Sequence, residues 1–141
     1  MSDAVHRPRP EASELTAEFW ESAARHVLVR PVCQDCGASF FSPQIACPKC
    51  LSLNWRYEPS GGNGVVYSAT VVHRAPYPGF DAPFHLAIVD FEDEGWSMLT
   101  NLVAAGEEAV AIGTPVELDW LDVEEGYALP QFKPLAEGEK A

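Results

Sequence analysis

The sequence predicts a mainly β protein, in which an N-terminal amphipathic helix and a small metal-bound ribbon precede a five-stranded barrel. Three observations predict this fold class. All four cysteines form two C-x-x-C pairs in the first half of the chain. An apolar pattern with helical spacing precedes the first pair, and five segments with the pattern of β-strands follow residue 64. A glycine-rich junction at residues 59–64 separates the two parts.

The length and composition predict about one domain with a metal-bound appendage, since 47% of the 141 residues are hydrophobic. We expect a flexible lead-in (1–14), the helix and ribbon (15–60), the barrel (61–135) and a tail (136–141). No apolar run approaches the roughly 18 residues of a membrane span, and the N-terminus has no apolar signal region. We therefore expect a soluble cytoplasmic protein with reduced cysteines.

The negative charge is concentrated in the barrel segment. Residues 1–62 carry six Lys/Arg and seven Asp/Glu, whereas residues 63–141 carry three and fourteen, a net charge of −11. Nucleic-acid binding requires basic side chains that neutralise phosphates. The charge distribution therefore predicts no nucleic-acid partner.

The first predicted element is an amphipathic helix at residues 15–28, where apolar residues recur at three- to five-residue steps. Ser13 or Thr16 can cap its start. Phe19 and Trp20 form a large aromatic pair on this short helix. They either pack on the core of this chain or anchor a partner protein, because aromatic residues are enriched in interface hot spots.

The two C-x-x-C pairs predict a metal site. Each turn points two thiolates at one point, so Cys33, Cys36, Cys47 and Cys50 can complete a tetrahedral shell of four sulfurs. Zinc is the expected ion, and iron is an alternative because it accepts the same ligands. Two disulfides are a further alternative, but adjacent C-x-x-C disulfides would be strained. Four thiolates leave no position open for water or substrate, so we expect a structural metal.

Three short strands are predicted around this site, at residues 27–32, 38–41 and 53–58. We expect Phe40, Phe41 and Ile45 to cover one side of the metal loop, because so small a ribbon has little core of its own.

Five strands are predicted after the junction, at residues 65–73, 84–91, 96–103, 116–122 and 127–132. Residues 106–113, between the third and the fourth, are long enough for one or two helical turns. Five strands with a short helical connection after the third are the outline of an OB-fold barrel.

The loop at residues 74–83 joins the first two barrel strands and contains three prolines. In OB-folds this loop is a frequent ligand or partner surface. We expect Arg74, Tyr77 and Phe80 to contact a partner or an anionic ligand. The alternative is a solvated loop whose aromatic residues only cap the barrel.

No catalytic constellation emerges from the sequence. The cysteines are assigned to the metal, no G-x-S-x-G motif exists, and the four histidines lie in separate contexts. His85 lies in an apolar strand, and we interpret it as a barrel residue with satisfied hydrogen bonds. We therefore expect that this chain is not an enzyme by itself.

Several motifs occur here in one order, from about residue 15 to 135: the Phe19-Trp20 helix, the two cysteine pairs, the glycine-rich junction leading into residues 64–68, the loop at 72–80 and the closing segment 129–132. This combination resembles the DUF35 family, a rubredoxin-like zinc ribbon followed by an OB-fold. The resemblance implies that the four cysteines are the metal ligands. One departure is Pro31-Val32 before the first cysteine, where relatives often have a polar or basic residue.

The resemblance also implies a non-catalytic accessory subunit of an enzyme that acts on coenzyme A thioesters. Such subunits pair chiefly with thiolase-fold enzymes (thiolases, synthases and aldolases) and sometimes with MaoC-like enoyl-CoA hydratases. We expect a hetero-oligomer in which the ribbon and the Phe19-Trp20 helix dock the partner. The barrel would help to shape an acyl-CoA entrance, with the coenzyme A thioester at or near the shared interface.

Two other classes of function remain as alternatives. An OB-fold can bind nucleic acid, although the acidic barrel argues against it. Iron in the four-sulfur site would instead make a rubredoxin-like electron carrier, which a red colour of the purified protein would reveal.

Overall fold

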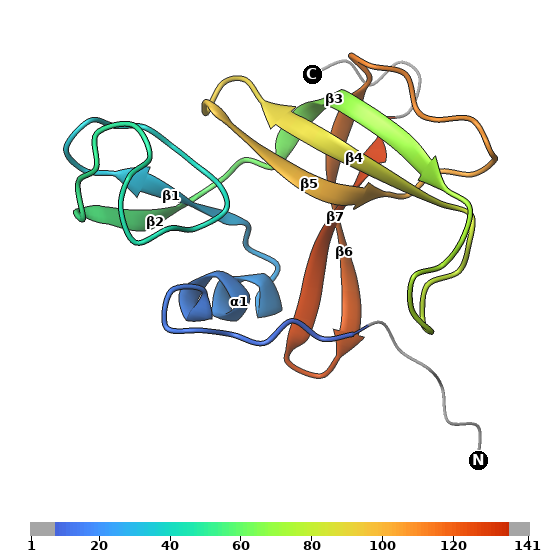
Figure 1. Cartoon of the computed structure of the whole chain (residues 1–141), viewed down its shortest axis with the longest axis horizontal. Coiled ribbons are helices and arrows are strands. Elements are labelled where there is room, and N and C mark those ends of the chain that lie inside the picture. Colours follow the sequence, from blue (N-terminus) through green and yellow to red (C-terminus); the bar gives the residue numbers. More distant parts are fainter. Residues whose placement is uncertain (1–7, 136–141) are drawn as a thin grey trace.

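The computed structural model describes residues 8–135. It contains one helix, a two-stranded ribbon and a closed barrel (Figure 1). The bounds of the elements are α1 (Ala17–Ala24), β1 (Val29–Cys33), β2 (Trp55–Pro59), β3 (Asn63–Val72), β4 (Phe84–Phe91), β5 (Trp96–Leu102), β6 (Pro115–Glu124) and β7 (Tyr127–Pro134). The first half of the predicted lead-in and the predicted tail lie outside the described residues.

The barrel has the strand order β3-β4-β5-β7-β6 and closes through β3 and β6. All neighbouring pairs are antiparallel except β5 with β7, which pair in parallel at Leu102 and Phe132. Along β4, buried and half-buried residues alternate, because successive side chains of a strand point to opposite faces. This arrangement confirms the predicted mainly β fold with a five-stranded OB-fold barrel.

Three aromatic rings pack together in the barrel core. Phe91 stacks on Trp96 with 4.3 Å between ring centroids, and Phe132 lies 5.5 Å from Phe91. All three side chains are at most 4% exposed. The core continues outside the barrel, because Phe41 of the ribbon contacts both Trp96 and Phe19 of the helix. Ribbon, helix and barrel are therefore packed against one another.

The helix is shorter than predicted because it ends at a left-handed residue. His26 has φ 58°, and the N–H groups of His26 and Val27 donate back to the carbonyls of Ala23 and Ser22. The His26 ring stacks on Trp120 of β6. The helix thus ends where His26 contacts the β6–β7 hairpin, beside which Figure 1 shows the helix.

Two predicted elements are wrong in detail. Residues 106–113 form bends and a turn in place of a helix. Forming the first turn of a helix is unfavourable, and in so short a segment packing does not offset this, since Val110 packs on the core but Ile112 is exposed. The predicted strand at residues 38–41 is reduced to one bridge between Val32 and Ser39. Among the described residues, no helix is long and apolar enough to cross a bilayer.

Candidate metal centre and surrounding surfaces

Four cysteine side chains converge in the ribbon. Cys33 ends β1, Cys36 follows in the next turn, and Cys47 and Cys50 belong to a second turn. Their Sγ atoms all lie within 4.8 Å of one another. Cys33 Sγ is 3.6 Å from Cys50 Sγ, and Cys36 Sγ is 3.7 Å from Cys47 Sγ. Tetrahedral zinc at about 2.3 Å from each sulfur would separate neighbouring sulfurs by about 3.8 Å. The four residues therefore fit one four-coordinate metal ion.

The two cysteine turns have the same backbone geometry. The N–H of Gly37 donates to the Cys33 carbonyl at 2.9 Å, and the N–H of Leu51 donates to the Cys47 carbonyl at 2.8 Å. Both donors follow the second cysteine of their pair, and both have positive φ, 78° for Gly37 and 66° for Leu51. Sequence reasoning had no signal for this at Leu51, because leucine rarely adopts such a conformation.

The backbone of the turns favours the ionised form of two of the thiols. The N–H of Cys36 donates to Cys33 Sγ and lowers the pKa of the Cys33 thiol to about 7. Burial raises the pKa of the Cys47 thiol, but hydrogen bonds from N–H groups, including that of Cys50, together lower it by a larger amount. The pKa of Cys47 is therefore lowered overall. The Ser52 N–H lowers the pKa of Cys50, yet burial and the three neighbouring cysteines raise it to about 12. A divalent cation at the centre would favour the thiolate form of all four.

One side of the site is covered by Phe40, which is 6% exposed and makes an edge contact with Trp55 at 5.6 Å. The prediction that Ile45 shares this role is wrong. Its carbonyl accepts a hydrogen bond from Trp55 Nε1–H at 3.1 Å, while its side chain is 75% exposed. Phe41 packs between the helix and the barrel instead of on the metal loop.

The two aromatic residues of α1, Phe19 and Trp20, differ in how deeply they are buried. Phe19 is 4% exposed and belongs to the core cluster, so the structure favours the packing alternative for this side chain. Trp20 is half-buried and lines a cavity of about 410 Å³, together with Tyr127 of the β6–β7 hairpin. Contact of Trp20 with a partner stays a prediction.

The loop at residues 74–83 joins β3 to β4, as predicted. Arg74 is exposed and Tyr77 is 61% exposed, whereas Phe80 lies against Phe84 with 5.3 Å between ring centroids. The structure does not bring these residues to the metal site, which lies in the ribbon (Figure 1). Their contact with a partner or anionic ligand stays a prediction.

His85 is only partly satisfied. Its side chain is 2% exposed, and its Nε2–H donates to the Gly106 carbonyl at 3.1 Å. The other ring nitrogen, Nδ1, is buried and has no hydrogen-bond partner among the described residues. The sequence-based interpretation of a fully satisfied residue is therefore right for one ring nitrogen and wrong for the other.

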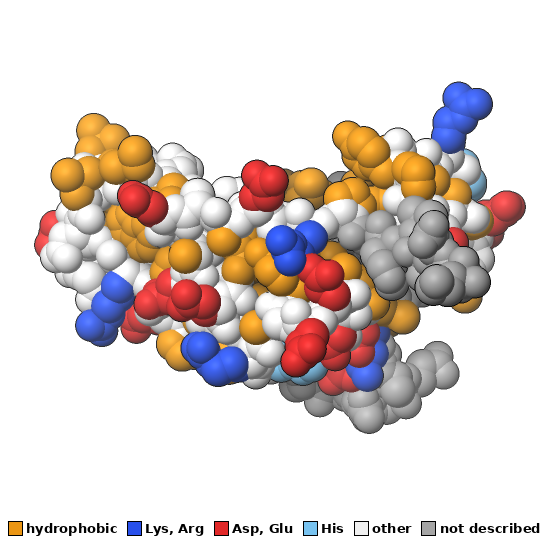
Figure 2. Space-filling view, turned by 90° about the horizontal axis from the view of Figure 1, so that it is seen from below, with side chains coloured by type: hydrophobic (Ala, Val, Ile, Leu, Met, Phe, Trp, Pro, Cys, Tyr) orange, Lys and Arg blue, Asp and Glu red, His pale blue; other side chains and the backbone are white. Residues whose placement is uncertain are grey.

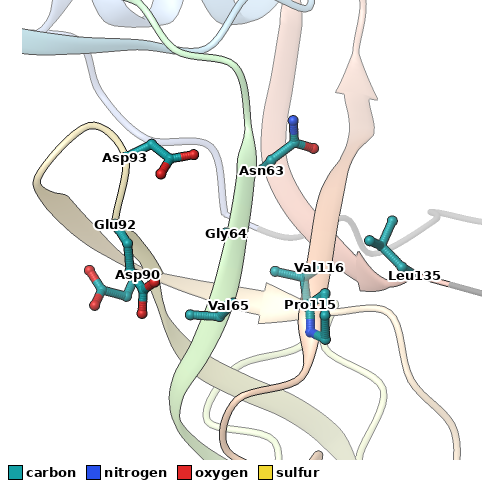
Figure 3. Close-up of a pocket in the computed structure, with 9 residues that line it drawn as sticks. All are labelled: Asn63, Gly64, Val65, Asp90, Glu92, Asp93, Pro115, Val116 and Leu135. Atoms are coloured by element: carbon teal, nitrogen blue, oxygen red, sulfur yellow. The ribbon is translucent and has the colours of Figure 1, made fainter. Parts of the chain in front are cut away.

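A cavity of about 400 Å³ lies at the seam between β3 and β6 (Figure 3). Asp90, Glu92 and Asp93 line one side of it, while Pro115 and Leu135 contribute apolar surface on the other. Like charges repel, so this cavity is unsuited to the phosphate groups of a nucleotide or of coenzyme A.

Two family profiles match consecutive parts of the chain. Residues 20–56 match the rubredoxin-like zinc ribbon domain of ChsH2, and residues 57–121 match the C-terminal OB-fold domain of ChsH2.

Two curated relatives cover most of the chain. It is 36% identical over 135 residues to a probable enoyl-CoA hydratase alpha subunit of Thermomonospora curvata; the match covers 96% of this chain but 42% of that protein. It is 34% identical over 123 residues to a DUF35 domain-containing scaffold protein of Methanocaldococcus jannaschii, covering 79% of this chain and 84% of that protein.

Among solved structures, the chain is similar to one from an Ltp2-ChsH2(DUF35) aldolase. The TM-score is 0.80 at 36% sequence identity, and the match covers 89% of this chain and 98% of that one. The likeness therefore spans both ribbon and barrel.

Proposed function

The chain belongs to the DUF35 family, and on that premise we propose that it is a non-catalytic accessory subunit of a thiolase-fold acyl-CoA enzyme. The observation that carries the proposal is the structural match to a DUF35 chain of an aldolase at 36% identity over nearly its whole length. The relative described as a scaffold protein supports the same role. We propose that the subunit assembles with a thiolase, synthase or aldolase and helps to shape its acyl-CoA site.

A second candidate is a subunit of a MaoC-like enoyl-CoA hydratase. The similarity to a probable enoyl-CoA hydratase alpha subunit favours it. The match covers 42% of the length of that protein.

We infer that the bound metal is zinc and that its role is structural. The zinc ribbon profile supports zinc, and four thiolates would fill a tetrahedral shell. The ion would hold the two cysteine turns together. Free cysteines in such a site suit a reducing compartment, so a cytoplasmic location remains part of the proposal.

The coenzyme A thioester would lie at or near the interface with the partner. The carboxylates of the cavity between β3 and β6 would repel its phosphates, so we place the thioester away from that cavity. The acidic barrel opposes nucleic-acid binding for the same reason.

Co-expression tests the proposal. A tagged chain is expressed with the thiolase-like and hydratase-like proteins encoded beside it, and the purified material is assayed for thioester turnover and metal. We expect a colourless hetero-oligomer with one zinc per chain, with turnover only when the enzyme partner is present. Co-purification with the hydratase alone would favour the second candidate. Turnover by the isolated chain, or co-purification with neither enzyme, would overturn the accessory role.

A further inference from the structure

Three large aliphatic side chains project into solvent from the metal ribbon. Ile45 is 75% exposed, Leu51 76% and Leu53 72%. We call these three residues the ribbon tip. Figure 2 shows apolar side chains gathered at the ribbon end of the molecule. Single exposed aliphatic residues are common on proteins, whereas contiguous exposed apolar patches mark binding surfaces more often.

The backbone that carries the ribbon tip is held in place. The N–H of Leu51 donates to the Cys47 carbonyl, and the Cys47 N–H donates to the Ser52 carbonyl, both at 2.8 Å. Trp55 Nε1–H holds the carbonyl of Ile45. A surface presented from a fixed backbone loses little conformational entropy on binding.

Leu51 occupies a position where leucine is unfavourable for folding. Its counterpart in the first cysteine turn is Gly37, which has the same hydrogen bond and a similar φ. A left-handed conformation costs a residue with a Cβ about 1–2 kcal/mol. Because the Leu51 side chain is 76% exposed, burial within this chain does not offset that cost. A strained residue whose side chain is not buried within its own chain points to a role of that side chain in binding.

Area and charge indicate which kind of molecule the ribbon tip binds. A stable interface takes about 20–30 residues from each partner, so the three residues of the ribbon tip can form only part of one. Each chain also carries a net charge of −12, and two copies would repel each other. The tip therefore suits a different protein with an apolar cleft, within a larger interface whose basic residues face the acidic barrel.

We propose that Ile45, Leu51 and Leu53 insert into an apolar cleft of the acyl-CoA enzyme subunit, as the anchor of the complex. The inference rests on the proposed function and adds the surface through which the subunit binds. It assigns the contact to residues beside the second cysteine turn, so the metal positions the anchor.

The decisive variant is Leu51→Gly, which places in the second turn the residue that the first turn already has. We expect unchanged zinc content and an unchanged or higher melting temperature, because the backbone strain is relieved. We expect the affinity for the co-purifying enzyme subunit to fall at least about tenfold, as for loss of an interface hot spot. Leu53→Ser, which leaves the turn unchanged, is expected to weaken binding in the same way.

The matched control is Ile112→Ser. Ile112 is also 76% exposed but lies in the connection between β5 and β6. The affinity of the Ile112→Ser variant for the enzyme subunit should stay within about twofold of that of the unaltered chain. If the unaltered chain binds the enzyme and both tip variants bind equally well, the anchor is wrong while the accessory role stands. If the unaltered chain binds no enzyme subunit, both the anchor and the accessory role are overturned. If the chain instead forms a homodimer that Leu51→Gly dissociates, the anchor is overturned while the accessory role stands.

Discussion

Arg30 Nη1, on ribbon strand β1, lies 3.6 Å from Glu94 Oε2, in the turn between barrel strands β4 and β5. Glu94 also accepts hydrogen bonds from Ser60 Oγ and the Gly61 N–H at 2.5 and 3.1 Å, and from Trp96 Nε1–H at 3.0 Å. One carboxylate thus joins the ribbon, the junction and the barrel. This contact fixes how a docked ribbon would be placed relative to the barrel.

Removal of the Glu94 charge should weaken the fold in a pH-dependent way. Burial raises the pKa of Glu94, but the hydrogen bonds and Arg30 lower it overall, below its ordinary value of 4.5. The ionised form is therefore stabilised by folding, and this contribution is present above pH 4.5 and lost as the pH falls through the lower folded value. We expect Glu94→Gln to reduce the free energy of unfolding by about 1–2 kcal/mol at pH 7, and by less at pH 3, in urea titrations.

The control for this change is Glu92→Gln, in the same turn, where the side chain is exposed. Its effect should stay within about 0.5 kcal/mol. An equal loss for Glu94→Gln at both pH values would show that the charge is not what matters.

Gly64 should not tolerate a side chain. A Cβ there would lie 2.5 Å from Val89 Cγ1 and 2.9 Å from the Asp90 carbonyl oxygen, which is backbone and cannot rotate away. Strands β3 and β4 would have to separate, so we expect Gly64→Ala to lower the free energy of unfolding by about 1–3 kcal/mol. Gly61→Ala is the control, because a Cβ there meets no atom of the described residues within 4 Å. Thermal unfolding of the two variants measures the difference, and equal stabilities would refute the close approach.

Tyr57 should fasten the segment before α1 to the ribbon. Its hydroxyl donates to the Leu15 carbonyl at 2.7 Å, and burial, together with the charge of Glu18, raises its pKa to about 12. Its neutral form is stabilised by folding, so stability should fall as the pH rises from 10 towards 12. Tyr57→Phe should cost about 1 kcal/mol at pH 7 and remove this alkaline loss.

Tyr67→Phe is the matched control, because Tyr67 is 63% exposed. Chemical unfolding at pH 7 and at pH 11 compares the two variants. An alkaline loss that persists in Tyr57→Phe would assign it to another group.

Metal removal should unfold the ribbon. Cys47 is fully buried in the cluster, and Cys47→Ser would replace a thiolate ligand by a poor one. We expect loss of stoichiometric zinc and greater proteolysis between residues 34 and 54, which a chelator should reproduce in the unaltered chain. Lys49→Ala, in the same turn, should keep the metal. A chain that stays protease-resistant after complete loss of zinc would contradict a structural role for the metal.

Local patterns were sufficient to predict most of the elements. Strand β4 was predicted with its observed bounds, because an apolar run between turn residues has few other solutions. The cysteine spacing brought four sulfurs together, since C-x-x-C geometry is set within each turn. The predicted helix at residues 106–113 failed because helix formation in so short a segment depends on packing that the sequence does not display.

The candidate surfaces were harder to predict. Glu94 belongs to an acidic turn that resembles an ordinary solvated loop, and its partner Arg30 is far away in sequence. Leu53 alternates with Trp55 as if both were buried, yet it is 72% exposed. Pattern reasoning assigns apolar residues to the core, and an aliphatic residue exposed for binding has the same pattern.

The sequence alone determined the ribbon, the barrel and the four cysteines that converge, because these follow from short-range spacing and alternation. Only the tertiary structure decided that Phe19 is buried, that Ile45, Leu51 and Leu53 are exposed, and that Glu94 joins the two parts. The reason is that exposure and long-range pairing depend on which surfaces the other elements cover, and no local pattern contains that information.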